Sequence, residues 1–160
     1  MSSEDAVVMD GIAQVKLPVT DVVRSARWYG RLLGVRLWTE VVEDGVLRGA
    51  GLMDPGGRYN IALRDRRVCA GSPDLTGFDV LAFRPRTRAD LEAIADRCDR
   101  LGIARGEIET TGAGARLDVP DPDGTVVRFY QFELPTTDFL GVEFANGVEI
   151  GFYATPRIDH

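Results

Sequence analysis

Short stretches of this chain alternate apolar and polar residues, and two longer stretches repeat apolar residues at helical spacing. Residues 12–19 alternate in this way, which predicts a strand with one face on a core. Residues 21–33 place apolar side chains three or four positions apart, and Thr20 or Asp21 supplies an N-cap. Gly34 follows, as glycine commonly does after a helix. The chain is therefore predicted to begin with a strand and a helix.

Three further strands are predicted after this helix, at residues 35–43, 46–53 and 59–66. The segments between them, Asp-Gly at residues 44–45 and Pro-Gly-Gly at 55–57, have the composition of tight turns. Because the connections are so short, we expect these strands to form an antiparallel meander.

The same order of elements returns in the second half of the chain. Thr87 can cap a helix that ends at Gly102, and Asp90 suits its first turn, where a carboxylate meets the positive end of the helix dipole. Strand, helix and three strands thus occur twice at a period of roughly 65 residues, which indicates a duplication. The strands predicted in this half are residues 78–84, 103–109, 115–119 and 126–132, with an Asp-Pro-Asp-Gly turn before the last.

These elements predict an α+β fold, in which two βαβββ modules form curved mixed sheets around a concave cavity. The first module takes residues 1–66, of which 1–10 are a loose leader. The second module takes residues 77–133, and residues 67–76 link the two.

Residues 134–160 extend beyond the second module. Asn146-Gly147 lies between two alternating stretches, and a type I′ turn favours this dipeptide because both of its central residues need positive φ. We therefore predict a C-terminal β-hairpin. Two roles are open for it: it covers an open sheet edge, or it serves as a lid or a dimer contact.

Composition and charge exclude several classes of protein. The chain has 160 residues, of which 44% are apolar, enough for an ordinary globular core. Its N-terminus offers no basic start followed by an apolar run, and no stretch approaches about 20 apolar residues, so we expect a cytoplasmic protein away from membranes. A net charge of −6 disfavours nucleic acid as a partner. Two cysteines, Cys69 and Cys98, do not suggest a disulfide scaffold.

Histidine usage restricts the chemistry further, because the single histidine, His160, is the last residue. Catalytic zinc sites commonly take two or three histidines, and the iron facial triad takes two with a carboxylate. One chain cannot assemble either set. A site that shares His160 between two subunits is conceivable, although terminal residues are often frayed. The sequence therefore predicts neither a metal nor another cofactor.

Two segments resemble the vicinal oxygen chelate superfamily, which includes glyoxalase I, extradiol dioxygenases and the fosfomycin and bleomycin resistance proteins. IAQVKLPVTDVVRSARWYGRLLGVRL, which begins at Ile12, resembles the opening strand and helix of a module. LDVPDPDGTVVRFYQF, which begins at Leu117, resembles its closing hairpin. The resemblance covers about residues 11–133 and implies the duplicated fold predicted above.

Enzymes of this superfamily hold a divalent metal at four strand positions. In this sequence the resemblance places those positions at Gln14, Ala62, Val80 and Arg128. A guanidinium opposes metal binding where a cation would sit. The resemblance therefore implies a metal-free member of the superfamily.

Strand alternation then selects the side chains that face the cavity. Lys16, Arg64, Arg84 and Arg128 would favour a ligand with an anionic or polar edge, and Trp38 and Tyr130 could stack on an aromatic ring. Alternatively, Arg64 and Arg84 lie at strand ends and face solvent, and Trp38 packs in a core. The predicted ligand-binding residues are Gln14, Lys16, Trp38, Asn60, Arg64, Val80, Arg84, Arg128 and Tyr130.

Three functions are compatible with this cavity. The first is a binding protein of the bleomycin resistance type, which sequesters a small aromatic natural product or drug-like compound in self-resistance. The second is a metal-independent tailoring enzyme that uses an acid or base such as Tyr130, Lys16, Glu40 or Asp79. A metal-dependent lyase or dioxygenase ranks third. A homodimer is expected, as in many relatives.

Overall fold

The computed structural model describes residues 9–133 and 139–158, so the predicted leader lies largely outside the described residues, as does His160. The chain folds into two compact units. The first is Met1–Phe78 together with Asp121–Thr125, and the second is Asp79–Pro120 together with Val126–His160. Each unit is built around one four-stranded sheet.

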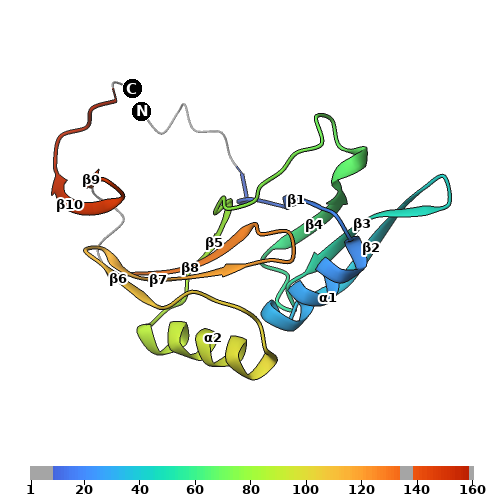
Figure 1. Cartoon of the computed structure of the whole chain (residues 1–160), viewed down its shortest axis with the longest axis horizontal. Helices are drawn as coiled ribbons and strands as arrows, with labels where there is room; N and C mark the ends of the chain where they lie inside the picture. The colour runs from blue at the N-terminus through green and yellow to red at the C-terminus, as the bar shows by residue number, and fades with distance from the viewer. Residues whose placement is uncertain (1–8, 134–138, 159–160) are drawn as a thin grey trace. The chain divides into compact units, whose positions relative to one another are not determined.

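The first unit has the order strand, helix and three strands. Its sheet runs β1-β4-β3-β2, in which β1 and β4 are parallel and the other neighbours are antiparallel (Figure 1). The elements are β1 (Val15–Val19), α1 (Val22–Leu33), β2 (Arg36–Glu43), β3 (Val46–Met53) and β4 (Asn60–Asp65).

Helix α1 has the predicted ends and covers one face of this sheet. The Asp21 side chain accepts a 2.9 Å hydrogen bond from the backbone N–H of Arg24, and Gly34 adopts the left-handed conformation at φ 72°. Tyr29 projects from α1 into the core and is fully buried. Residues of β1 and β4 that point to the same side, including Leu17 and Leu63, are buried with it.

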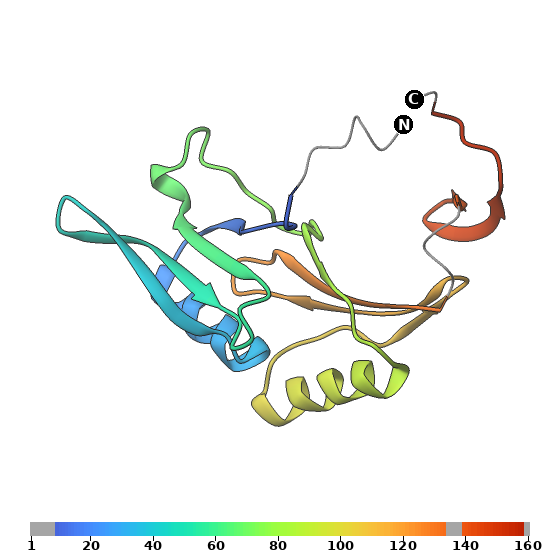
Figure 2. The same cartoon turned by 180° about the vertical axis from the view of Figure 1, so that it is seen from behind.

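The second unit repeats this plan. Its sheet runs β5-β8-β7-β6, with β5 and β8 parallel, and helix α2 lies along one face (Figure 2). A separate antiparallel pair, β9 and β10, forms the C-terminal hairpin. These findings confirm the α+β fold, with one helix on each mixed sheet and a terminal hairpin. The elements are β5 (Leu81–Phe83), α2 (Arg88–Leu101), β6 (Glu109–Thr111), β7 (Gly114–Pro120), β8 (Val126–Phe132), β9 (Gly141–Ala145) and β10 (Val148–Tyr153).

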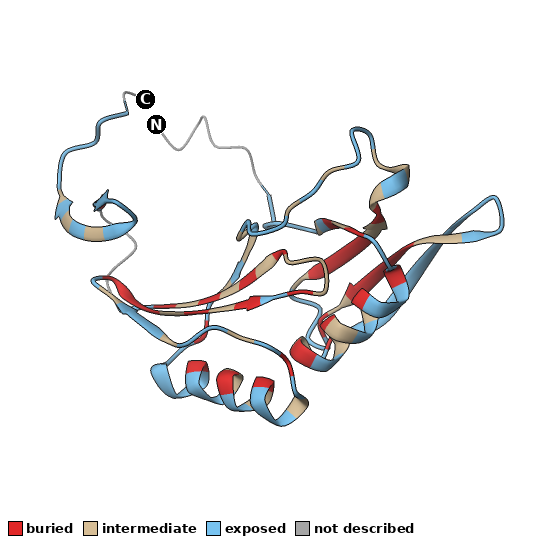
Figure 3. Cartoon of the chain, in the orientation of Figure 1, coloured by how far each residue is buried: buried red, intermediate tan, exposed pale blue. Residues whose placement is uncertain are grey.

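Helix α2 begins with a complete capping box. The Thr87 hydroxyl accepts from the backbone N–H of Asp90, and the Asp90 carboxylate accepts from the backbone N–H of Thr87. Buried residues of α2 face the sheet (Figure 3), and among them is Cys98, whose thiol pKa burial raises. Cys98 and Cys69 are both free thiols. No helix within residues 9–133 and 139–158 is long and apolar enough to cross a bilayer.

Three predicted strands differ from the structure. The first begins at Val15, which pairs with Ile61, so the predicted residues 12–14 lie outside the strand. The strand expected at 78–84 is limited to β5. The strand expected at 103–109 is wrong: pairing with β7 begins only at Glu109, the last of those residues.

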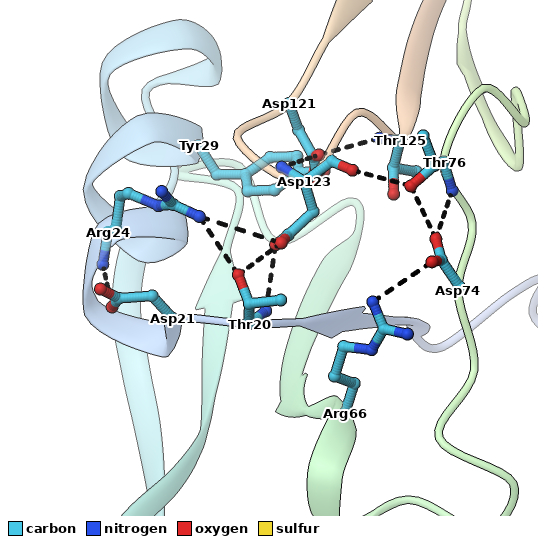
Figure 4. Close-up of polar contacts among 10 residues, drawn as sticks. All are labelled: Thr20, Asp21, Arg24, Tyr29, Arg66, Asp74, Thr76, Asp121, Asp123 and Thr125. Atoms are coloured by element: carbon cyan, nitrogen blue, oxygen red, sulfur yellow. Dashed lines mark hydrogen bonds and ion pairs between the residues drawn. The ribbon is translucent and has the colours of Figure 1, made fainter.

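The turn between β7 and β8 belongs to the first unit. Asp121 accepts hydrogen bonds from the backbone N–H groups of Asp123 and Thr125, which shape the turn (Figure 4). The Tyr29 hydroxyl of α1 donates to the Asp121 carboxylate at 2.9 Å. Asp123 in turn accepts from the backbone N–H of Thr20 at 3.1 Å. The β7–β8 turn of the second module therefore forms part of the core that surrounds helix α1 of the first module.

Candidate ligand-binding site

The second sheet has two chemically different faces. Alternate residues of β7 and β8, such as Leu117 and Phe129, are buried on the side of α2. The opposite face carries polar and charged side chains at the intervening positions. They are Arg116 and Asp118 on β7, and Arg128 and Tyr130 on β8.

Carboxylates neutralise both arginines of this face. The Arg128 Nε and Nη2 donate to Asp118 at 2.8 and 2.9 Å, and its Nη1 lies 2.5 Å from Asp79. The hydrogen bonds to Asp118 are the main reason that the pKa of Arg128 lies above its ordinary value. Arg116 donates to Glu109 from Nε and Nη2 at 2.9 and 2.6 Å. The face therefore consists of ion pairs that run across neighbouring strands.

A cavity of about 580 Å³ lies between this face and the hairpin. Tyr130 contributes its ring to the lining, and its hydroxyl lies 2.9 Å from the Thr111 hydroxyl, also in the lining. Apolar side chains of β9 and β10 form part of the lining. The lining residues are Glu109, Thr110, Thr111, Gly112, Ala113, Arg116, Arg128, Tyr130, Val142, Phe144, Gly147, Val148 and Glu149.

The hairpin contacts the second sheet through Gly112. A Glu149 carboxylate oxygen accepts a 2.9 Å hydrogen bond from the Gly112 backbone N–H. A Cβ at position 112 would overlap both that carboxylate and the Phe152 ring, so both side chains would have to move to accommodate it. Phe144 lies directly opposite Glu149 in the hairpin, and both residues line the cavity.

The first sheet brings two predicted ligand-binding residues into direct contact. The Gln14 Nε2 donates to the Asn60 Oδ1 at 2.9 Å. Asn60 is buried, and its Nδ2 has no hydrogen-bond partner within residues 9–133 and 139–158. Lys16 is exposed and pairs in register with Ala62, so it shares a face with Gln14 and Asn60.

Trp38 lies beside Asn60 on this face. It sits at a register shift between β2 and β3, and its ring lies over Gly51 near the Asn60 amide. The side chain is 63% exposed, so it is not a core residue.

The remaining predicted residues have other surroundings. Arg64 donates to Glu43 at 3.1 Å, and the Arg84 guanidinium lies 5.7 Å from the centre of the Phe132 ring. Val80 is partly exposed just before β5. Carboxylates of neighbouring segments therefore pair with both Arg64 and Arg128.

The superfamily's metal does not fit these residues. Ala62 and Val80 have no metal-binding atoms, and Arg128 places a guanidinium, already held by Asp118, at a ligand position. Residues 9–133 and 139–158 contain no group of three His, Cys, Asp or Glu side chains that could hold a metal ion. We therefore assign no step to a metal.

Sequence reasoning missed several residues of the cavity. Phe144 and Glu149 lie in the C-terminal extension, outside the two modules, and Thr111 lies beyond the strand predicted at residues 103–109. The sequence does contain one indication of Phe144. Val142 and Phe144 are two positions apart, so in a strand their side chains form one apolar face.

Comparisons with known proteins identify the family. The model of the Glyoxalase/Bleomycin resistance protein/Dioxygenase superfamily matches residues 11–129. The chain belongs to this superfamily. The match ends within β8, so strands β9 and β10 lie beyond it.

Solved structures share the fold. A glyoxylase/bleomycin resistance protein/dioxygenase domain from Frankia sp. EAN1pec is 25% identical, with a TM-score of 0.65 over 79% of this chain and 94% of that chain. An antibiotic-binding protein from Streptomyces sp. CB03234 is 20% identical, with a TM-score of 0.62 over 80% and 100%. A fosfomycin resistance protein from Listeria monocytogenes is 13% identical, with a TM-score of 0.60 over 79% and 97%. No curated protein matches the sequence significantly.

Proposed function

We propose that this protein is a metal-independent small-molecule-binding protein of the glyoxalase/bleomycin resistance type. It binds or sequesters an aromatic natural product or drug-like compound, as a self-resistance protein would. The observation that carries the proposal is the cavity between the second sheet and the hairpin. Its volume, about 580 Å³, lies within the usual range for sites that enclose a drug-sized ligand.

The lining has the composition expected of such a site. Phe144, Val142 and Val148 offer apolar surface, and the Tyr130 ring can stack on an aromatic ligand. Because Arg116 and Arg128 are already bound to carboxylates, a polar edge on the ligand suits this cavity better than an anionic edge.

The relatives support a binding role. One solved structure of the same fold is named an antibiotic-binding protein, and another is named a fosfomycin resistance protein. The proposal includes a cytoplasmic location and a homodimer, in line with the properties of the sequence.

Native mass spectrometry of the full chain tests this function. Incubation with doxorubicin, bleomycin or plumbagin should give a stoichiometric complex with at least one compound, unchanged by a chelator. Liquid chromatography of the same mixtures should return the compound intact. A complex that forms only with an added divalent ion would overturn metal independence, and failure of every compound in a wider panel of aromatic antibiotics would overturn the binding function.

A metal-independent tailoring enzyme is the alternative, and the placement of Tyr130 favours it. Its phenol lines the cavity and shares a hydrogen bond with Thr111, so it could exchange a proton with a bound compound. Conversion of a compound with turnover, abolished in Tyr130→Phe, would select this alternative. Asp79, another candidate acid or base, forms an ion pair with Arg128.

A further inference from the structure

The two arginines that line the cavity do not make it positively charged. Arg116 is bound by Glu109, and Arg128 is bound by both Asp118 and Asp79. Each arginine therefore has its countercharge within the protein. An anionic ligand would have to compete with these carboxylates for the guanidinium donors.

Glu149 is the exception among the charged residues of the lining. One of its carboxylate oxygens accepts the hydrogen bond from the Gly112 N–H, an uncharged donor. No cationic side chain in the described part of the chain lies within ion-pair distance of Glu149. The half-buried carboxylate thus brings an uncompensated negative charge to the cavity wall.

Aromatic surface lies next to this charge. Phe144 pairs directly with Glu149 across β9 and β10, so their side chains are on the same face of the hairpin. Tyr130 supplies a second ring to the lining, and its ring centre lies 4.1 Å from that of Phe132. Aromatic faces attract cations as well as apolar rings, which adds to the effect of the carboxylate.

We infer that the cavity selects a flat aromatic ligand that bears a protonated amine. The ring system packs against Tyr130 and Phe144, and the ammonium group binds the Glu149 carboxylate. The inference rests on the proposed binding function and specifies its ligand class. Glu149 and Phe144 lie beyond residues 11–129, so these selective groups are outside the segment that matches the superfamily model.

Three acridines with one ring frame test this inference by isothermal titration calorimetry of the full chain. They are cationic 9-aminoacridine, neutral acridone and anionic acridine-9-carboxylate. The cation should bind at least about threefold more tightly than the neutral compound, and the anion should bind most weakly. Glu149→Gln should remove this preference, because glutamine can still accept from Gly112 but carries no negative charge.

Glu143→Gln is the matched control. Glu143 is the other acid of β9 and β10, next in sequence to Phe144 and therefore on the opposite face of the strand. It should leave all three affinities unchanged. Equal affinities for the three acridines, or a preference that persists in Glu149→Gln, would overturn the inference while the binding function stands. If no acridine binds, the inference is also wrong, and the antibiotic panel decides the binding function separately.

Discussion

Tyr29 and Asp121 lie 92 positions apart in the sequence, and the Tyr29 hydroxyl donates a 2.9 Å hydrogen bond to the Asp121 carboxylate. Both side chains are buried. Burial raises the pKa of each, because removal from water disfavours the phenolate and the carboxylate alike. The Tyr29 bond and two backbone N–H groups offset part of this cost for Asp121.

Removal of the Tyr29 hydroxyl should therefore destabilise the protein. Tyr29→Phe keeps the ring in the core and takes one donor from a buried carboxylate, so the free energy of unfolding should fall by about 1–2 kcal/mol. Urea denaturation followed by circular dichroism measures this. Tyr153→Phe serves as control, because Tyr153 contacts Phe139 and Arg157 through its ring, and it should change stability by less than about 0.5 kcal/mol. Equal effects of the two variants would refute this role of the Tyr29 hydroxyl.

Asp65 should make stability depend on pH in the acid range. Its carboxylate accepts hydrogen bonds from Arg67 and Arg48, which hold its pKa well below the usual range despite burial. In the unfolded chain the pKa of the Asp65 carboxyl is higher, about 3.9. The stabilisation is therefore present above that pH and is lost as the pH falls below it.

The comparison of wild type with Asp65→Asn isolates this contribution. The difference between their free energies of unfolding should be largest near neutral pH and should shrink between about pH 5 and pH 2. Thermal melts across this range measure it. Asp96→Asn, at an exposed position of α2, should run parallel to wild type. A difference for Asp65→Asn that stays constant with pH would exclude the ion pairs as its cause.

The contact of the hairpin with the second sheet should depend on Gly112. In Gly112→Ala the new methyl would displace Phe152 and the Glu149 carboxylate, so the hydrogen bond to residue 112 should be lost. Hydrogen exchange should then be faster across β9 and β10 and unchanged in β8. Gly151→Ala is the matched control, since a Cβ there meets nothing within 4 Å. Unchanged exchange in Gly112→Ala would contradict the described contact.

Trp38 should be the tryptophan that is open to solvent. Its side chain is 63% exposed, whereas Trp28 is partly covered and lies edge-on to Tyr29 at 4.8 Å between ring centres. Trp38→Phe should remove most of the fluorescence that iodide quenches and change stability by less than about 0.5 kcal/mol. Trp28→Phe is the comparison and should retain the quenchable emission. Weak quenching in the wild type would mean that Trp38 is covered in solution.

Local signals in the sequence predicted much of the fold. Asp21, Thr87 and the glycines that follow each helix mark helix ends, because their side-chain acceptors or positive φ values satisfy the terminal backbone groups. Asn146 and Gly147 have φ values of 51° and 76°, as the type I′ turn requires. The division of the chain at residues 67–76 stays a prediction.

The site was harder to predict, because it depends on register and on long-range contacts. Arg128 was placed on the correct strand, but its pairing with Asp118 depends on the β7–β8 register, and its pairing with Asp79 depends on the segment before β5. Glu149 reaches Gly112 over 37 positions, a contact that no local pattern encodes. Tyr130 was predicted, and it lines the cavity.

The two copies of the βαβββ module are not equivalent, because the Asp121–Thr125 turn of the second copy belongs to the first unit. A fragment that stops at Phe78 would keep every strand of the β1-β4-β3-β2 sheet. It would nevertheless lack Asp121, which accepts the hydrogen bond from the buried Tyr29 hydroxyl. The first βαβββ sequence therefore completes its core only after synthesis has passed residue 125.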